Sequence, residues 1–265
     1  MFQIVKVRKE GRQRIVQHLR SNLLHNLFVI YDLLYEPERT IMYVTHDDSG
    51  SLRGHLLIYK GFATIPLAAR LDGEERYTQR LLEMLPNEKM VLFCPTNLLK
   101  IVKKKFREAC CYPEYQMYVA KGEERLVTSN LVERLKPEHA SLLCELYASG
   151  EPSFVRSEER CRKLLEKSGV YGIFEGSKLA SAAISVERLP EVGEVTGVFT
   201  HPKYRGRSFG TMTTSAATED VLRHADGSNL YVRADNRPAV RVYEKLGYKK
   251  IDQWYWVDVG VGLKP

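Results

Sequence analysis

One stretch of the chain, "YRGRSFGT" at residues 204–211, constrains the fold more than any other. It follows the apolar run 193–200, which His201-Pro202 ends because proline lacks the N–H that a strand ladder needs. A Thr/Ala-rich segment of helical pattern, 209–223, comes next. The first amides of a helix have no intrahelical partners and its dipole favours an anion, so this order predicts a phosphate site. The alternative is a solvated basic turn in which the Ser208 side chain caps the helix.

A second motif, "ADNRPAVRVYEKLGY" at residues 234–248, predicts a short helix with Pro238 in its first turn and Gly247 as its stop. Ala239 and Tyr243 are four residues apart and therefore share a face of this helix. A phenol stays protonated at neutral pH and can protonate a departing thiolate. The competing interpretation of Tyr243 is a core aromatic residue with a satisfied hydroxyl.

The pattern around these motifs predicts an α+β (mixed α/β) domain. It comprises a first strand at 126–135, helices at 137–148 and 157–167, a hairpin over 170–189, and then strand, helix, strand, helix, strand to residue 259. The amino-terminal half repeats this order, and "SGSLRGHLLI" can be laid beside "EGSKLASAAI". We therefore expect two copies of one fold, 1–125 and 126–265. A single unrelated accessory domain is the alternative for the first half.

The loop and the tyrosine helix together resemble the GCN5-related N-acetyltransferase (GNAT) superfamily. The matching residues are "VTGVFTHPKYRGRSFG" and "NRPAVRVYEKLGY", and the order of elements fits from about Leu126 onward. A degenerate first copy is similar to the FR47-like and glycine N-acyltransferase-like branches. The resemblance implies a GNAT fold with a central mixed, mostly antiparallel sheet flanked by helices, and acetyl transfer from acetyl-CoA to a primary amine by direct attack.

The resemblance also implies roles for single residues. Tyr243 falls on the position of the general acid, and Glu194 near that of a general base that acts through water. An N–H at Val198 or Phe199 would donate to the oxyanion. The positions implied for acetyl-CoA binding are Val198, Phe199, Thr200, Arg205, Gly206, Arg207, Ser208, Phe209, Gly210, Thr211 and Asn236.

The first copy lacks these features. Its corresponding connection carries Asp72, Glu74 and Glu75 where a diphosphate would need amides and positive charge, and like charges repel. Its helix 96–106 has Lys104 seven residues after Asn97 and no tyrosine there. We expect the first copy not to bind coenzyme A, and to pack against the catalytic half or shape the acceptor site.

Composition limits the other classes of function. The formal net charge of +7 is spread among acidic residues, so it suits an anionic small molecule, and no nucleic-acid motif accompanies it. The five cysteines show no C-x-x-C spacing, so we expect no zinc site and no other metal. The chain has no long apolar span and no signal-peptide pattern at its start, which predicts a cytoplasmic protein without a membrane partner.

Three questions stay open at this point. The acyl donor could be a bulkier acyl-CoA with an amino acid such as glycine as acceptor, as in the glycine N-acyltransferase-like branch. The chain could also be a non-catalytic acyl-CoA-binding or interaction module. The sequence does not choose between monomer and homodimer, and it carries no signature of the acceptor.

Overall fold

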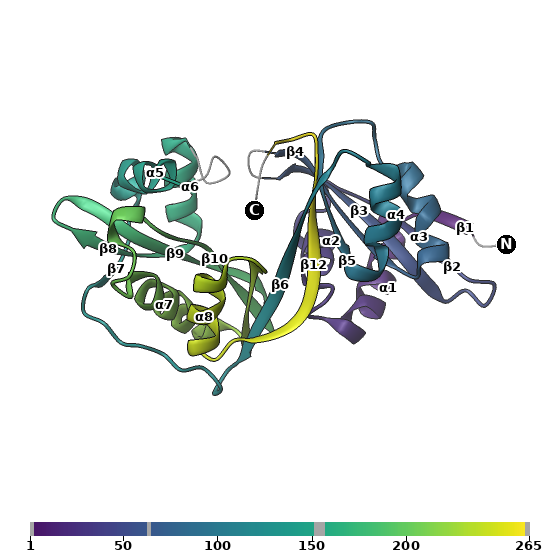
Figure 1. Cartoon of the computed structure of the whole chain (residues 1–265). Helices are drawn as coiled ribbons and strands as arrows, with labels where there is room; N and C mark the ends of the chain where they lie inside the picture. Colours follow the sequence, from purple (N-terminus) through teal and green to yellow (C-terminus); the bar gives the residue numbers. More distant parts are fainter. Residues whose placement is uncertain (1–2, 63–64, 151–156, 263–265) are drawn as a thin grey trace. The chain divides into compact units, whose positions relative to one another are not determined.

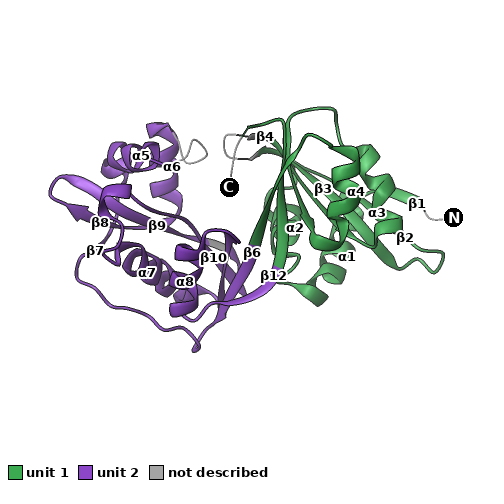
Figure 2. Ribbon diagram, in the orientation of Figure 1, with its two compact units in different colours: residues 1–114, 253–265 green, residues 115–252 purple. Residues whose placement is uncertain are grey.

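The computed structural model describes residues 3–62, 65–150 and 157–262 as two compact units. Unit 1 comprises residues 1–114 and 253–265, and unit 2 comprises residues 115–252 (Figures 1 and 2). No helix among the described residues is long and apolar enough to cross a membrane.

Unit 2 is a mixed sheet with helices against it. Its strands β7, β8, β9 and β10 form an antiparallel meander, and β11 joins β10 in parallel. The elements are β7 (Val132–Arg134), α5 (Ala140–Ala148), α6 (Glu158–Lys167), β8 (Gly169–Glu175), β9 (Lys178–Leu189), β10 (Val192–Thr200), α7 (Phe209–His224), β11 (Gly227–Arg233) and α8 (Arg237–Lys245).

Unit 1 has the same arrangement. Strands β1 to β4 are antiparallel neighbours in order, and β5 joins β4 in parallel, as β11 joins β10. The elements are β1 (Gln3–Lys6), α1 (Lys9–Leu19), α2 (Leu27–Tyr35), β2 (Thr40–His46), β3 (Leu52–Phe62), β4 (Ile65–Gly73), α3 (Glu75–Leu81), β5 (Met90–Pro95) and α4 (Leu99–Lys105).

The sixth strand of each unit comes from the other half of the sequence. In unit 1, residues 254–259 of β12 (Lys249–Val259) pair antiparallel with β5. In unit 2, the strand next to β11 is β6 (Cys110–Ala120), and buried Gln116 donates a 2.9 Å hydrogen bond to Asn229 of β11. The compact units therefore divide inside β6 and β12, whereas the sequence suggested a boundary near Leu126.

The predicted order of elements is confirmed, and most of the bounds differ only by a residue or a turn. Ser157 begins α6 as an N-cap that accepts from the Arg160 amide at 3.3 Å. The expected strand 126–135 is reduced to β7, three residues long. In unit 1, α1 ends at Leu19 and a 3-10 turn follows it.

Small hydroxyl side chains hold α7 close to the sheet. Ser181 Oγ of β9 lies 2.8 Å from Thr200 Oγ1 at the end of β10 and 3.2 Å from Thr213 Oγ1 of α7. Thr213 also donates to the Phe209 carbonyl at 3.1 Å. These contacts fix the first turn of α7 relative to the end of β10.

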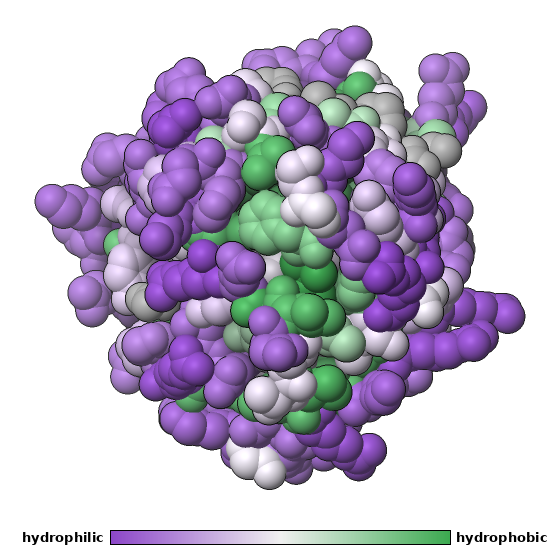
Figure 3. Space-filling view, turned by 90° about the vertical axis from the view of Figure 1, so that its left-hand side faces the viewer, coloured by the Kyte–Doolittle hydropathy of each residue, from purple (hydrophilic) through white to green (hydrophobic). Residues whose placement is uncertain are grey.

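The side of the protein that unit 2 presents in Figure 3 is largely hydrophilic, with a band of apolar surface running between charged and polar residues. Leu131, just before β7, is 52% exposed and is one of the large apolar side chains that unit 2 leaves in solvent. Apolar surface of this kind is typical of places where a ligand or another protein binds.

Candidate active site

Strand β10 carries a bulge near its carboxyl end. Its antiparallel register with β9 shifts between Thr196, which faces Ile184, and Phe199, which faces Ala182. Gly197 in the bulge has φ +58°, a conformation that favours glycine, and a Cβ there would collide with Ile184. A bulge leaves one residue out of the ladder, so the backbone at Val198 is released from regular pairing with β9.

A buried tyrosine fixes this bulge. The hydroxyl of Tyr147, on α5, donates a 2.6 Å hydrogen bond to the carbonyl oxygen of Gly197. Tyr147 is fully buried, and its ring lies 6.2 Å from that of Phe199 on the same strand. Sequence patterns did not predict a role for Tyr147, because nothing local marks it among the apolar residues of its helix.

Strands β10 and β11 pair in parallel only at their beginnings. The recorded pairs are Gly193 with Ser228 and Glu194 with Asn229. The carboxyl ends of the two strands are therefore not joined by a ladder in the described part of the chain. A substrate backbone can pair with strand groups that are left open in this way.

The loop after β10 presents a row of backbone N–H groups. From Gly206 to Thr211 the amides have no hydrogen-bond acceptor among the described residues, and they end in the first turn of α7. Gly206 has φ +80° with open space around its Cα, and a Cβ on Gly210 would lie 3.1 Å from Thr200 Oγ1. Open amides at a helix start are suited to phosphate oxygens.

Ser208 is in the left-handed conformation, with φ +60° and ψ +11°. It is the only non-glycine residue with positive φ in the described part of the chain. Its side chain makes no capping hydrogen bond to α7. The Ser208 side chain therefore does not act as the helix cap that the alternative interpretation of the loop required, because a capping side chain needs an extended backbone at this position.

The two arginines of the loop differ in their surroundings. Arg205 Nε donates to the Thr200 carbonyl at 3.3 Å, which holds the side chain beside the end of β10. Arg207 forms a 2.6 Å ion pair with Glu175 of β8, and its guanidinium lies 4.6 Å from the centre of the Phe209 ring. Both side chains are exposed. Glu175 partly balances the charge of Arg207, so Arg205 is the less compensated cation beside the amides.

Tyr243 lies on the buried face of α8, 6% exposed, among apolar residues of β6 and β11. Its ring centre is 6.2 Å from that of Tyr248. Burial, with a smaller contribution from Tyr248, raises the pKa of the Tyr243 hydroxyl above its ordinary value of 10. The hydroxyl is therefore neutral at physiological pH and holds a proton.

Asn236 is the N-cap of α8, where its side chain accepts from the Ala239 amide at 3.3 Å. This is a structural role, since it satisfies one of the helix's first amides. Pro238 in the first turn and Gly247, with φ +100° after the last turn, bound the helix as expected. The cap fixes where α8 begins and therefore where Tyr243 lies.

Glu194 is buried on β10 and forms an ion pair with Arg188 of β9. The Arg188 Nε and Nη2 atoms lie 2.7 Å and 2.6 Å from the same Glu194 oxygen, Oε2. Sequence patterns did not indicate Arg188. The register between β9 and β10 shifts between Val192 and Glu194, so strand alternation could not have placed Arg188 beside Glu194.

None of the five cysteines forms a disulfide. Cys94 and Cys161 are buried, and burial raises the pKa of the Cys94 thiol to about 12, whereas Cys110 is exposed. No group of three or more His, Cys, Asp or Glu residues suited to a metal ion occurs within residues 3–62, 65–150 and 157–262.

Comparison with solved structures identifies the fold of the whole chain. A Drosophila protein matches with a TM-score of 0.77 and 11% identity over 97% of this chain and 98% of its own. A tandem GNAT protein from the clavulanic acid biosynthesis pathway matches with a TM-score of 0.60 and 15% identity over 99% of this chain and 100% of its own. The chain therefore has a two-domain GNAT fold.

Sequence comparison places part of the chain in a family. Residues 170–257 match the family described as FR47-like protein. A mycothiol acetyltransferase of Corynebacterium aurimucosum is 44% identical over 63 residues, which are 23% of this chain and 21% of that relative. The matched part thus spans about a fifth of the relative's length. The match to the FR47-like family is therefore limited to one segment of the chain, residues 170–257.

Proposed function

We propose that this protein transfers an acetyl group from acetyl-CoA to a primary amine. The observation that carries the proposal is the row of unbonded amides from Gly206 to Thr211, directly after a strand whose bulge is fixed by a buried tyrosine. The family match over residues 170–257 includes the loop and the bulged strand, whereas Tyr147 lies before the matched segment. The matched relative is named an acetyltransferase, which favours acetyl over a bulkier acyl group.

In this proposal the loop holds the diphosphate of the cosubstrate. The amides of Gly206 to Thr211 donate to phosphate oxygens, and Arg205 adds positive charge. The end of β10, at Val198, Phe199 and Thr200, offers backbone groups to the pantetheine amides, since β11 does not pair there. Asn236 acts indirectly, by fixing the start of α8.

The chemistry is a direct displacement at the thioester carbon. The uncharged amine forms the new C–N bond, the C–S bond breaks, and the N–H of Val198 stabilises the oxyanion between these events. Tyr243 gives its proton to the departing thiolate. Before the attack, Glu194 removes the proton that converts the incoming ammonium into the uncharged amine. It does so through a water molecule, because its carboxylate is engaged with Arg188.

The test is release of free coenzyme A with acetyl-CoA and a panel of primary amines. We expect acceptor-dependent release by the natural protein, and a loss of about 100-fold in kcat with little change in KM for acetyl-CoA in Tyr243→Phe. Tyr255→Phe is a matched control, because Tyr255 lies on the part of β12 in unit 1. Unchanged turnover in Tyr243→Phe would remove the proposed acid.

Two alternatives predict different results in the same assay. A glycine N-acyltransferase-like enzyme would prefer longer acyl-CoA thioesters and glycine over acetyl-CoA and the amine panel. A non-catalytic module would be stabilised by acetyl-CoA in thermal unfolding and release no thiol with any acceptor.

A further inference from the structure

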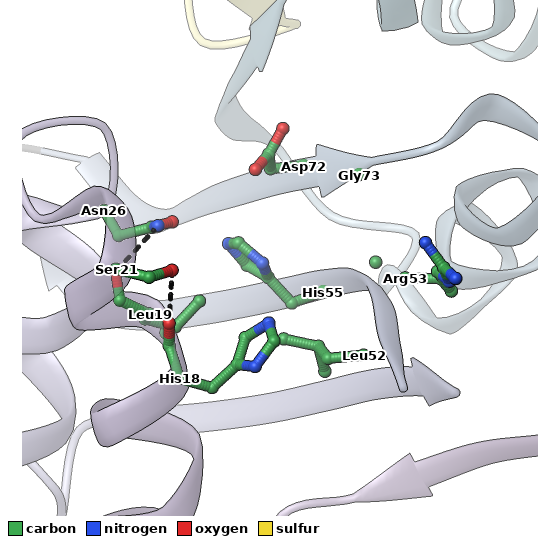
Figure 4. Close-up of a pocket in the computed structure, with 10 residues that line it drawn as sticks. His18, Leu19, Ser21, Asn26, Leu52, Arg53, His55, Asp72 and Gly73 are labelled. Atoms are coloured by element: carbon green, nitrogen blue, oxygen red, sulfur yellow. Dashed lines mark hydrogen bonds between the residues drawn. The ribbon is translucent and has the colours of Figure 1, made fainter. Parts of the chain in front are cut away.

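Unit 1 contains a pocket of about 140 Å³ that none of the features above explains. It lies between the turn after α1 and the adjacent ends of β3 and β4 (Figure 4). The end of β4 corresponds to the end of β10 in unit 2, because both strands are followed by a helix and paired in parallel with the next strand. The side chains that line the pocket are His18, Leu19, Ser21, Asn26, Leu52, Arg53, His55 and Asp72.

His55 is the unusual member of this lining. It is 4% exposed, and its ring makes no hydrogen bond or ion pair to any described residue. Figure 4 shows the ring between Asp72 and His18, directed into the pocket. Buried polar groups are normally hydrogen-bonded, so an imidazole without a protein partner points to a ligand or an ordered water.

The pocket wall contains one carboxylate, Asp72, and one guanidinium, Arg53. Asp72 faces His55 across the β3–β4 pair, and one of its oxygens lies 3.0 Å from His25 Nε2. Burial opposes ionisation of Asp72, but the hydrogen bond with His25 and the nearby histidines leave its pKa below the ordinary value. Arg53 contributes little positive charge, because it is bonded to two carboxylates, Asp47 at 2.7 Å and Glu74 at 3.2 Å.

Ser21 and Asn26 each contribute an acceptor to the pocket wall, which also contains the His18 imidazole. Ser21 donates its hydroxyl proton to the His18 carbonyl, and Asn26 donates its amide protons to the carbonyls of Leu19 and Asn22. The Ser21 oxygen and the Asn26 carbonyl oxygen therefore remain as acceptors. Burial keeps His55 neutral at physiological pH, so one of its ring nitrogens also accepts.

From this juxtaposition of a partnerless buried imidazole, a carboxylate and two further acceptors, we infer that the pocket binds a small primary amine in its ammonium form. An ammonium has three donors and no acceptor, which matches the wall. A cavity of about 150 Å³ holds a molecule of about six non-hydrogen atoms, so the ligand is small. The Asp72 carboxylate also disfavours the phosphates of coenzyme A as occupants of this pocket, because like charges repel.

The test compares three probes of nearly equal size: ethanolamine as the ammonium, ethylene glycol as the neutral molecule and glycolate as the anion. Binding is measured on the full chain by titration calorimetry and by the ring resonances of ¹⁵N-histidine-labelled protein. We expect saturable binding of ethanolamine that shifts the His55 resonances, and none of the other two. No effect of ethanolamine, or equal effects of all three probes, would overturn the inference.

Two variants sharpen the result. Asp72→Asn removes the charge that the ammonium contacts and is expected to weaken ethanolamine binding about tenfold. Glu75→Gln removes a charge three residues away on an exposed side chain outside the pocket, and binding is expected to stay unchanged. If Asp72→Asn does not fold, the inference is tested by whether ethanolamine shifts the His55 resonances of the natural protein. No acetyl-CoA is present, so failure here is independent of the transferase proposal.

Discussion

The hydroxyl of Tyr147 and the carbonyl of Gly197 form a 2.6 Å hydrogen bond that joins helix α5 to the bulge of β10. This contact sets the direction of the backbone where the proposed oxyanion donor, the N–H of Val198, lies. The corresponding register between β3 and β4 in unit 1 runs from Gly54 opposite Gly73 to Lys60 opposite Leu67 with no recorded shift. The bulge is therefore a structural difference between unit 2, the proposed catalytic unit, and unit 1.

Replacing Tyr147 by phenylalanine keeps the ring and removes the hydrogen bond. Because the Gly197 carbonyl loses a buried partner, we expect the free energy of unfolding to fall by about 1–2 kcal/mol. The bulge would relax, so kcat should fall about tenfold while KM for acetyl-CoA changes little. Steady-state kinetics and urea unfolding measure the two effects. An unaltered kcat in a destabilised protein would assign Tyr147 a purely structural role.

Replacing Ser208 by glycine removes a side chain from a left-handed position. Glycine adopts this conformation without the steric cost of about 1 kcal/mol, and Ser208 makes no capping bond that would be lost. We expect acetyl-CoA to bind at least as tightly, and unfolding to require slightly more denaturant. Ser208→Val should weaken acetyl-CoA binding and lower the stability of the fold, because a β-branched residue tolerates positive φ poorly. Weaker acetyl-CoA binding in the glycine variant would indicate that the serine hydroxyl contacts phosphate.

The raised pKa of Tyr243 predicts the alkaline side of the rate profile. A general acid works while protonated, and burial extends the protonated range of this phenol above its ordinary pKa of 10. We expect kcat to show no alkaline decline from Tyr243 up to pH about 10. The measurement is kcat against pH at saturating acetyl-CoA and amine. A decline near pH 8 that disappears in Tyr243→Phe would contradict the raised pKa of Tyr243.

Buried His55 predicts how stability depends on pH. Burial lowers its pKa from 6.5 to about 4, although the Asp72 charge opposes this, while His25, Arg70 and His18 favour it. Between pH 6.5 and 4 the unfolded chain binds a proton that the folded chain does not. This group therefore lowers stability as pH falls through that range, by at most about 1.4 kcal/mol per pH unit.

Urea unfolding at several pH values checks this dependence. We expect a shallower slope of stability against pH between 6.5 and 4 in His55→Gln than in the natural protein. His224→Gln is a suitable control, because His224 is an exposed residue near the end of α7. Equal slopes in all three proteins would mean that His55 titrates normally in the fold.

Sequence patterns predicted the order of helices and strands because the start and end of each element depend on local signals. Pro202 ends β10, Ser157 begins α6, and Gly247 ends α8, and each acts through its own backbone or a residue nearby. The resemblance brought the loop and Tyr243 into one proposed site by the same kind of evidence, motifs at fixed spacing. These features need no knowledge of distant pairing.

The features that sequence patterns did not predict depend on contacts between distant residues. Tyr147 is 50 residues from Gly197, and Gln116 is 113 residues from Asn229. The backbone of Ser208 is set by the geometry of its loop, and serine elsewhere prefers to cap. The sixth strand of each unit is placed by pairing between residues far apart in the chain. The periodicity of the sequence alone cannot reveal such pairing.

The exchange of strands between the halves has a consequence for biosynthesis. A ribosome releases the chain from its amino end, so β5 emerges long before the segment of β12 that pairs with it. Until then one edge of β5, a strand whose residues are all buried in the finished protein, has no neighbour. An uncovered apolar edge invites pairing with other chains. The amino-terminal half therefore cannot complete its sheet until the last strand of the chain has been made.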